Sequence, residues 1–168
     1  MLGVQTFKRE SEMGFEEAFS RLIVNEGGLS NVSGDAGGLT KYGISQRSYP
    51  DLDIGNLTIV EAKAIYLRDY WQRGGMDRYD SGLAFQVFDC SVNSGIGTAI
   101  RLLQRAVGVV EDGVVGPMTL AAIQSRSVCE VIMRFSAERL LFLVKLSGWN
   151  DFGRGWARRV ANNMLEAK

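Results

Sequence analysis

The stretch that decides the fold spans residues 81–94 and reads SGLAFQVFDCSVNS. A helix built from this stretch would be apolar nearly all round, which is typical of a helix buried at the centre of a globular protein. Ser81 is suited to cap its first turn. We therefore expect a mainly α-helical protein, with a bundle of helices around residues 81–94.

The polar stripe of this expected helix consists of Gln86, Asp89 and Asn93. These side chains could hydrogen-bond sugar substituents at the floor of a cleft, or they could satisfy each other and the neighbouring backbone. The sequence favours neither role over the other. We treat all three as candidate substrate-binding residues.

Helical patterns extend outward on both sides of this stretch. Towards the N-terminus, apolar residues recur with a helical period over residues 15–23, and residues 58–61 have the form of a capping box that opens a helix to about Arg73. Towards the C-terminus, the sequence predicts a helix that begins at Thr98 and another whose first residue is Pro117. A second capping box at residues 127–130 opens a long helix. A last helix carries Phe152, Trp156 and Val160.

Four further side chains are assigned to the core. Cys90 and Cys129 lie within apolar helical patterns, where a thiol usually acts as a small buried hydrophobe rather than as a disulfide partner. Trp149 and Trp156 could stack on sugar rings. Because aromatic residues spaced along an amphipathic helix usually belong to the core, we leave them out of the site.

Glu26 continues the apolar face of residues 15–23, one turn beyond Leu22. A carboxyl group on a core face is poorly hydrated, so its neutral form is favoured and its pKa rises, as a general acid requires. The alternative is a solvated residue in the last turn of the helix, with Gly27 as its left-handed cap.

A glycine-rich loop follows Glu26, and residues 39–44 can form an irregular strand or hairpin. A loop that folds back on the helix end can bring Asp35 and Thr40 to the same cleft as Glu26. Two carboxyl groups across a cleft are what cleavage of a glycosidic bond requires. Alternatively, Asp35 and Thr40 only stabilise a tight turn.

The composition narrows the chemistry. The 168 residues include no histidine, which nearly excludes zinc hydrolases, serine triads and most cysteine hydrolases, because these need imidazole as a ligand or base. The formal net charge is zero, so the chain lacks the field of a nucleic-acid-binding protein, although Arg154, Arg158 and Arg159 cluster near the C-terminus. Carboxylate chemistry remains, and we expect no metal, cofactor or nucleic-acid partner.

The length suits one compact domain, and neutral charge makes a monomer the default. The N-terminal residues lack the apolar segment of a secretory signal, and no run of about 18 apolar residues follows. We therefore expect synthesis in the cytoplasm and no membrane anchor.

Several spaced motifs occur in order: Glu26-Gly27-Gly28, Asp35 with residues 37–45, Tyr70-Trp71, residues 85–89 and residues 93–95. Together they closely resemble glycoside hydrolase family 108, whose members are N-acetylmuramidases found as phage endolysins and in bacterial toxin-release systems. The remainder, including residues 112–119 and 152–157, looks like the predicted peptidoglycan-binding segment that usually follows that domain.

The resemblance implies a lysozyme-like fold with a small β-hairpin beside the active-site cleft. It divides the chain into an N-terminal extension at residues 1–14, a glycoside hydrolase region at residues 15–97 and a helical peptidoglycan-binding region at residues 98–168. Since no linker separates the last two, we expect them to pack as one body.

The resemblance also implies hydrolysis of the β-1,4 bond between N-acetylmuramic acid and N-acetylglucosamine, with Glu26 as the catalytic acid. By similarity to phage lysozymes, Asp35 would stabilise positive charge on the sugar or activate water, and Thr40 would hold that water. Tyr42 and Asn93 are candidate contacts to the glycan. Inverting and retaining mechanisms both remain open.

The implied partner is the glycan strand of peptidoglycan. An endolysin stays in the cytoplasm of its bacterial host until a holin or similar release system gives it access to the wall. Three alternatives remain, one of which is a nucleic-acid-binding protein that would use the C-terminal arginines, with an affinity that falls steeply as salt rises. The other two act on or bind peptidoglycan. A lytic transglycosylase would use the same glutamate without needing Asp35 or Thr40, and a non-catalytic module would bind peptidoglycan without turnover.

Overall fold

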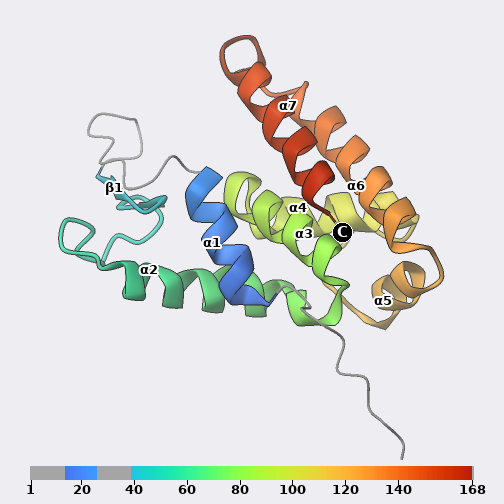
Figure 1. Cartoon of the computed structure of the whole chain (residues 1–168), viewed down its shortest axis with the longest axis horizontal. Helices are drawn as coiled ribbons and strands as arrows, with labels where there is room; N and C mark the ends of the chain where they lie inside the picture. The colour runs from blue at the N-terminus through green and yellow to red at the C-terminus, as the bar shows by residue number, and fades with distance from the viewer. Residues whose placement is uncertain (1–13, 26–38, 168) are drawn as a thin grey trace, which may run out of the picture.

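The computed structural model describes residues 14–25 and 39–167. Within these residues the protein is mainly α-helical, with one antiparallel sheet of two strands (Figure 1). The elements in chain order are α1 (Phe15–Asn25), β1 (Thr40–Lys41), β2 (Ile44–Ser45), α2 (Ile59–Tyr66), η1 (Leu67–Gln72), η2 (Met76–Arg78), α3 (Ser81–Ser94), α4 (Ile96–Val107), α5 (Pro117–Gln124), α6 (Val128–Leu143) and α7 (Trp149–Glu166). The expected mainly α, lysozyme-like fold is confirmed.

Helix α3 lies at the centre of the molecule, as its sequence predicts. Every residue from Gly82 to Ser91 is buried, and α1, α4, α6 and α7 pack around the helix. Its first turn is capped by Asp80 instead of the predicted Ser81, because the Asp80 carboxylate accepts a hydrogen bond from the Gly82 N–H at 3.0 Å. Aspartate and serine are about equally good caps, so the prediction chose the wrong one of two neighbours.

A single residue, Gly95, joins α3 to α4. Its backbone has φ 84° and ψ 145°, a conformation that residues with a side chain rarely adopt. The next helix therefore begins at once, at Ile96, and not at the predicted Thr98. The expected boundary between residues 97 and 98 thus falls inside the first turn of α4.

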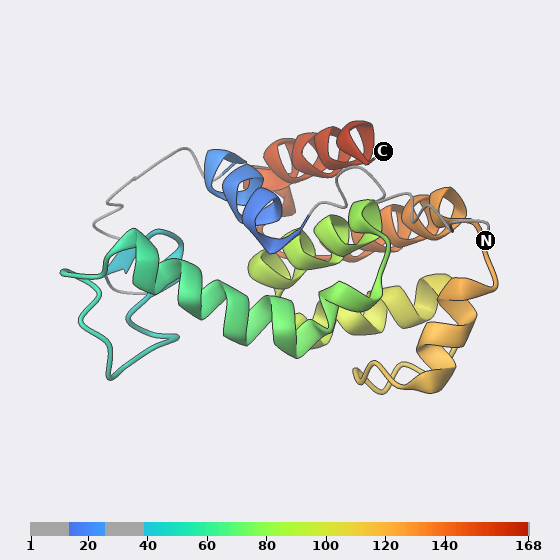
Figure 2. The same cartoon turned by 60° about the horizontal axis from the view of Figure 1, so that its bottom comes forward.

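Helix α2 and η1 form one continuous rod along the molecule (Figure 2). The predicted capping box at its start is confirmed: the Thr58 hydroxyl accepts from the Glu61 N–H at 3.3 Å, and the Glu61 carboxylate accepts from the Thr58 N–H at 2.8 Å. Beyond Tyr66 the rod continues as a π-helix, which the sequence pattern does not predict. Such segments are frequent at functional sites.

Aromatic rings fix α1 against this rod and against α3. The ring centre of Phe15 lies 5.7 Å from that of Trp71 and 6.1 Å from that of Phe88. The ring centre of Phe19 lies 5.6 Å from that of Tyr66. Tilted and edge contacts of this kind add to the free energy gained by burial. They hold in place the helix that ends directly before Glu26 in the sequence.

Strands β1 and β2 form the small hairpin that the sequence predicts, with Thr40 paired to Ser45. Its two turn residues, Tyr42 and Gly43, have φ values of 52° and 76°, as a type I′ turn requires. A Cβ atom on Gly43 would lie 2.5 Å from the Tyr66 hydroxyl oxygen, so the position needs glycine. The same hydroxyl donates to the Tyr42 carbonyl at 3.0 Å and ties the hairpin to α2.

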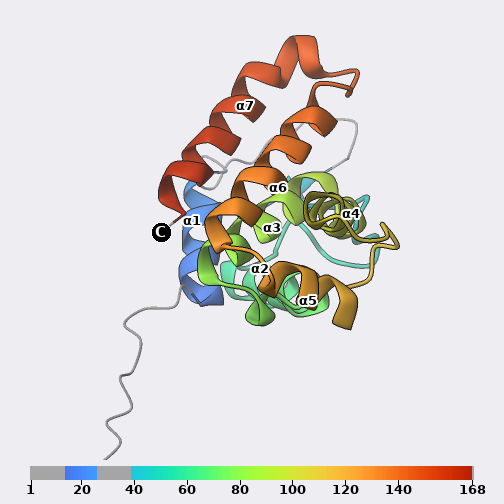
Figure 3. The same ribbon diagram turned by 90° about the vertical axis from the view of Figure 1, so that its right-hand side faces the viewer.

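Helices α6 and α7 form an antiparallel pair that extends away from α3 (Figure 3). Ser127 caps α6 as predicted, its hydroxyl accepting from the Glu130 N–H at 3.2 Å. Trp149 and Trp156 are half-buried, with ring centres 6.4 Å apart, and the exposed ring of Phe152 lies 5.9 Å from Trp156. The two tryptophans therefore form a satellite cluster outside the central core.

Both cysteines are free. Cys90 is buried in α3 as predicted, whereas Cys129 is exposed, because the first turn of α6 turns it towards solvent. Within residues 14–25 and 39–167, no helix is long and apolar enough to cross a membrane.

Candidate active site

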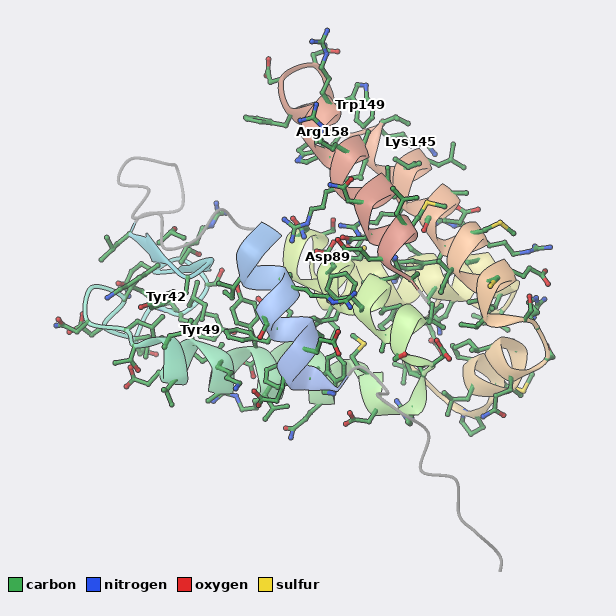
Figure 4. The ribbon with its side chains drawn as sticks, viewed as in Figure 1. Tyr42, Tyr49, Asp89, Lys145, Trp149 and Arg158 are labelled. Carbon is green, nitrogen blue, oxygen red and sulfur yellow. The ribbon has the colours of Figure 1, made fainter. Side chains whose placement is uncertain are left out.

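A cavity of about 400 Å³ lies where the loop after β2, η1 and the α3–α4 junction meet, and we call it the cleft. Its volume falls in the range of ligand pockets, about 300–1,000 Å³. Figure 4 shows Tyr49, one of its residues, on the same side of the molecule as Tyr42 of the hairpin. The cleft is lined by Ser48, Tyr49, Asp69, Tyr70, Arg73, Gly95 and Ile96.

A hydrogen-bonded carboxylate lies along one wall of the cleft. The Tyr49 hydroxyl donates to Asp69 Oδ2 at 2.8 Å, and Arg68 donates from Nε to Oδ1 and from Nη2 to Oδ2, both at 2.6 Å. The hydrogen bonds from Arg68 contribute most to holding the pKa of Asp69 below its usual value, against the opposing effect of partial burial. Asp69 is therefore ionised at neutral pH. It can accept hydrogen bonds from sugar hydroxyls but cannot serve as the general acid.

Two tyrosines give the cleft aromatic surface and hydroxyl donors. Burial, followed by the hydrogen bond to Asp69, raises the pKa of Tyr49, and burial raises the pKa of Tyr70. Both phenols therefore stay protonated at neutral pH. An aromatic ring with a polar tip suits a sugar, because a sugar ring has apolar faces and hydroxyl edges.

Of the three predicted catalytic residues, Glu26 and Asp35 lie outside the described residues. Glu26 directly follows the last residue of α1, Asn25, in the sequence. Thr40 is half-buried as the first residue of β1. Tyr42 is also half-buried, at the turn of the same hairpin. The structure therefore brings two of the predicted site residues, Thr40 and Tyr42, together.

The polar stripe of α3 faces α6 and α7. Gln86 donates from Nε2 to the Asn163 carbonyl at 2.6 Å. Asp89 forms ion pairs at 2.7 Å with Arg139 of α6 and with Arg159 of α7. Gln86 and Asp89 are fully buried. Both hydrogen-bond or pair with other parts of the protein, as expected if these side chains stabilise the fold and do not bind sugar.

Asn93, the third member of the stripe, is exposed at the end of α3. It donates from Nδ2 to the carbonyl of Asp89 at 2.7 Å. It lines a second cavity, which lies between α3, α6 and α7. Asn93 is therefore positioned to contact a ligand, although in a different cavity from Tyr49 and Asp69.

Sequence reasoning missed Tyr49, Asp69 and Arg73 as cleft residues. Tyr49 and Asp69 meet only because the loop after β2 folds back onto η1, and no periodic pattern reports such a contact. Tyr70 did carry a signal, because it belongs to the motif Tyr70-Trp71. In the part of the chain that the structure describes, no group of three or more His, Cys, Asp or Glu side chains could hold a metal ion.

Comparison with known proteins connects this cleft to a family. The profile of the family described as Glycosyl hydrolase 108 matches residues 19–95, which include every cleft residue except Ile96. A solved structure titled "Structure of Brucella abortus SagA" has a TM-score of 0.84 and 30% sequence identity, over 91% of this chain and 92% of that chain. No curated protein sequence matches the chain significantly.

The lysozyme-like fold, together with a glycosyl hydrolase profile that covers the cleft, defines a glycoside hydrolase of the class that degrades the bacterial cell wall. Within that class, the chain belongs to the glycosyl hydrolase 108 family.

Proposed function

We propose that this protein is an endolysin-like N-acetylmuramidase. It hydrolyses the β-1,4 bond between N-acetylmuramic acid and N-acetylglucosamine and so lyses the bacterial cell wall. The family match over residues 19–95 carries the proposal, because it includes the signature glutamate Glu26 and the cleft. Ionised Asp69 and the protonated hydroxyls of Tyr49 and Tyr70 support it, since they suit a neutral, hydroxyl-rich glycan.

In the proposed reaction, Glu26 protonates the oxygen of the leaving sugar. Asp35 stabilises the positive charge that develops on the other sugar or activates the attacking water, and Thr40 holds that water. Carboxyl groups about 6.5–9.5 Å apart would accompany inversion, and a separation of about 5–5.5 Å would accompany retention through a glycosyl-enzyme intermediate. Tyr42 contributes to glycan binding from the hairpin.

The same proposal covers the biological setting. Residues 98–168 add affinity for peptidoglycan, and a holin or similar release system delivers the protein from the host cytoplasm to the wall. The protein acts as a monomer on glycan strands and needs no cofactor, metal or nucleic acid. A bacterial secretion muramidase would use the same chemistry with a different delivery route.

Digestion of purified peptidoglycan tests the reaction. Glu26→Gln should reduce the rate of fragment release by at least about 100-fold, because general acid catalysis contributes about 10²–10⁴-fold. Glu17→Gln, a matched change at an exposed position of α1, should leave the rate unchanged. The released fragments are reduced with borohydride and identified by mass spectrometry.

Each alternative gives a different product. Reducible N-acetylmuramic acid ends that disappear with Glu26→Gln support the muramidase. Anhydro ends would show a lytic transglycosylase instead. Release of no fragments by the wild type, with peptidoglycan still bound, would make the protein a binding module.

A further inference from the structure

Arg73 brings a positive charge to the wall of the cleft. The residue follows η1 directly, and it is exposed. Its side chain forms no hydrogen bond and no ion pair with any residue in the described ranges 14–25 and 39–167. The N–H donors of its guanidinium group are therefore available to a ligand that enters the cleft.

The nearest carboxylate in the sequence does not pair with Arg73. Asp69 lies four residues before Arg73, a spacing at which opposite charges on a helix are neighbours. Arg68 instead donates to both oxygens of Asp69, each at 2.6 Å, and the Tyr49 hydroxyl donates to Oδ2 at 2.8 Å. The ion pair of Asp69 with Arg68 is thus complete without Arg73.

The cleft therefore offers two kinds of polar contact. Asp69 and the hydroxyls of Tyr49 and Tyr70 suit the neutral hydroxyl groups of a sugar. The planar guanidinium of Arg73 suits a carboxylate, because its N–H donors match the two carboxylate oxygens. Ionised Asp69 would repel an anion at its own position, so an anionic group belongs at the Arg73 side of the cleft. A ligand that uses every contact carries both hydroxyls and a carboxylate.

The proposed substrate carries such a carboxylate on one sugar of each repeat. In a strand of alternating N-acetylglucosamine and N-acetylmuramic acid, only the muramic acid has an acidic substituent, its lactyl group. The peptides joined to that group bring carboxylates of their own. A neutral glycan such as chitin offers hydroxyls but no carboxylate, so Arg73 can distinguish the two classes of glycan.

We propose that Arg73 determines the specificity of the cleft by binding a carboxylate on the muramic acid substituent. The cleft then selects acidic glycans over neutral ones. This assignment rests on the proposed function, which supplies the glycan. The carboxylate can come from the lactyl group of a sugar without a peptide, or from the peptide itself. Both sources present the same group to the guanidinium, and the ligands of the experiment separate them.

Calorimetric titration of the full-length Glu26→Gln protein tests the assignment without turnover. The ligands are tetrasaccharides of alternating N-acetylglucosamine and N-acetylmuramic acid. Their lactyl groups are free acids, neutral methylamides, or extended by L-alanyl-D-glutamate. At least one acidic form should bind about tenfold or more tightly than the methylamide, because hydrogen bonds between charged groups contribute at least that factor. The form that binds more tightly identifies the source of the carboxylate.

Substitutions of Arg73 in the same background locate the preference. Arg73→Gln should abolish it and leave the affinity for the methylamide unchanged. Arg73→Lys should keep part of it, because lysine keeps the charge but loses the planar arrangement of donors. Arg78→Gln removes the same charge at an exposed position of η2 that does not line the cleft, and it should keep the whole preference. Thermal unfolding checks that each variant is folded.

The outcome that overturns the assignment is direct. It would be equal binding of the acidic and neutral forms, a preference that survives Arg73→Gln, or an equal loss in Arg78→Gln.

Cleavage of the same tetrasaccharides by the protein with Glu26 intact is the second readout. The ratio of kcat/KM for the acidic form to that for the methylamide should fall about tenfold with Arg73→Gln. Binding that depends on Arg73 without cleavage of any form would contradict the muramidase and leave the role of Arg73 supported. Cleavage of acidic and neutral forms at equal rates would support the muramidase and overturn the role of Arg73.

Discussion

Two carboxylates, Asp69 and Asp89, are each held by arginine but in opposite surroundings. Asp69 belongs to the cleft, is 27% exposed and pairs with its immediate neighbour Arg68. Asp89 is fully buried and pairs with Arg139 and Arg159, which belong to two other helices. The first pair is local and solvated, whereas the second connects three helices across the centre of the molecule.

The difference in burial indicates that Asp69, and not Asp89, can contact a ligand without loss of the fold. An exposed ion pair contributes only about 0–1 kcal/mol to stability, so the polar wall of the cleft can be shaped for its ligand at little cost to the fold. Removal of one partner from a buried pair costs about 3–5 kcal/mol, because the remaining charge is left without compensation. Asp89, Arg139 and Arg159 therefore stabilise the packing of α3 against α6 and α7.

The largest effect is expected from Asp89→Asn. This change leaves Arg139 and Arg159 facing each other without their shared anion, so the free energy of unfolding should fall by about 3–5 kcal/mol. Urea denaturation measures the loss. Asp151→Asn, at an exposed position of α7, is the matched control and should change stability by less than about 0.5 kcal/mol. A loss of unfolding free energy for Asp89→Asn no larger than that for Asp69→Asn would contradict the conclusion that the buried pairs contribute more to stability than the exposed pair.

A smaller effect is expected from Tyr49→Phe, which removes the hydroxyl that donates to Asp69. The free energy of unfolding should fall by about 1 kcal/mol, and cleavage of peptidoglycan should slow because the cleft loses a polar contact. Tyr79→Phe is the matched control, since the Tyr79 hydroxyl donates to the Gly74 carbonyl at 3.1 Å away from the cleft. It should cost similar stability without slowing cleavage.

The smallest effect is expected from the titration of Asp69. Its folded-state pKa lies below its unfolded value, which is about 3.9 for aspartate. Its contribution to stability is therefore fully present above about pH 4 and is lost as pH falls through the lower, folded-state pKa. At neutral pH, Asp69→Asn should cost less than about 1 kcal/mol.

Urea denaturation of wild type and Asp69→Asn from pH 7 down to pH 2 checks this expectation. The difference in unfolding free energy should be constant at neutral pH and shrink only in the acid range. A difference that shrinks between pH 5 and pH 7 would show that the pKa of Asp69 is raised. Asp69 would then be a candidate proton donor.

Much of the fold follows from local sequence signals. The all-round apolar pattern of residues 81–94 correctly predicted a buried central helix, and the capping box at residues 58–61 correctly located the start of α2. Such features depend on neighbours three or four positions apart, which a sequence displays directly. The hairpin turn at Tyr42 and Gly43 is similarly local.

The features that the sequence did not reveal depend on distant contacts. The partners of Asp89 come from α6 and α7, so its pattern within α3 could not separate a ligand-binding role from a structural one. The contact between Tyr49 and Asp69 depends on the path of a loop. The start of α4 was placed late because Gly95 ends one helix and begins the next without a connecting loop.

The junction between α3 and α4 has a geometric consequence for any polymer that the protein holds. Asn93 and Ser94 line the second cavity, which lies between α3, α6 and α7, and the next two residues, Gly95 and Ile96, line the cleft. Consecutive Cα atoms are about 3.8 Å apart, so the walls of the two cavities are separated by a single peptide unit. A branched polymer that occupied both cavities at once would need its branch to span this fixed separation, so the junction would limit the length of branch that fits.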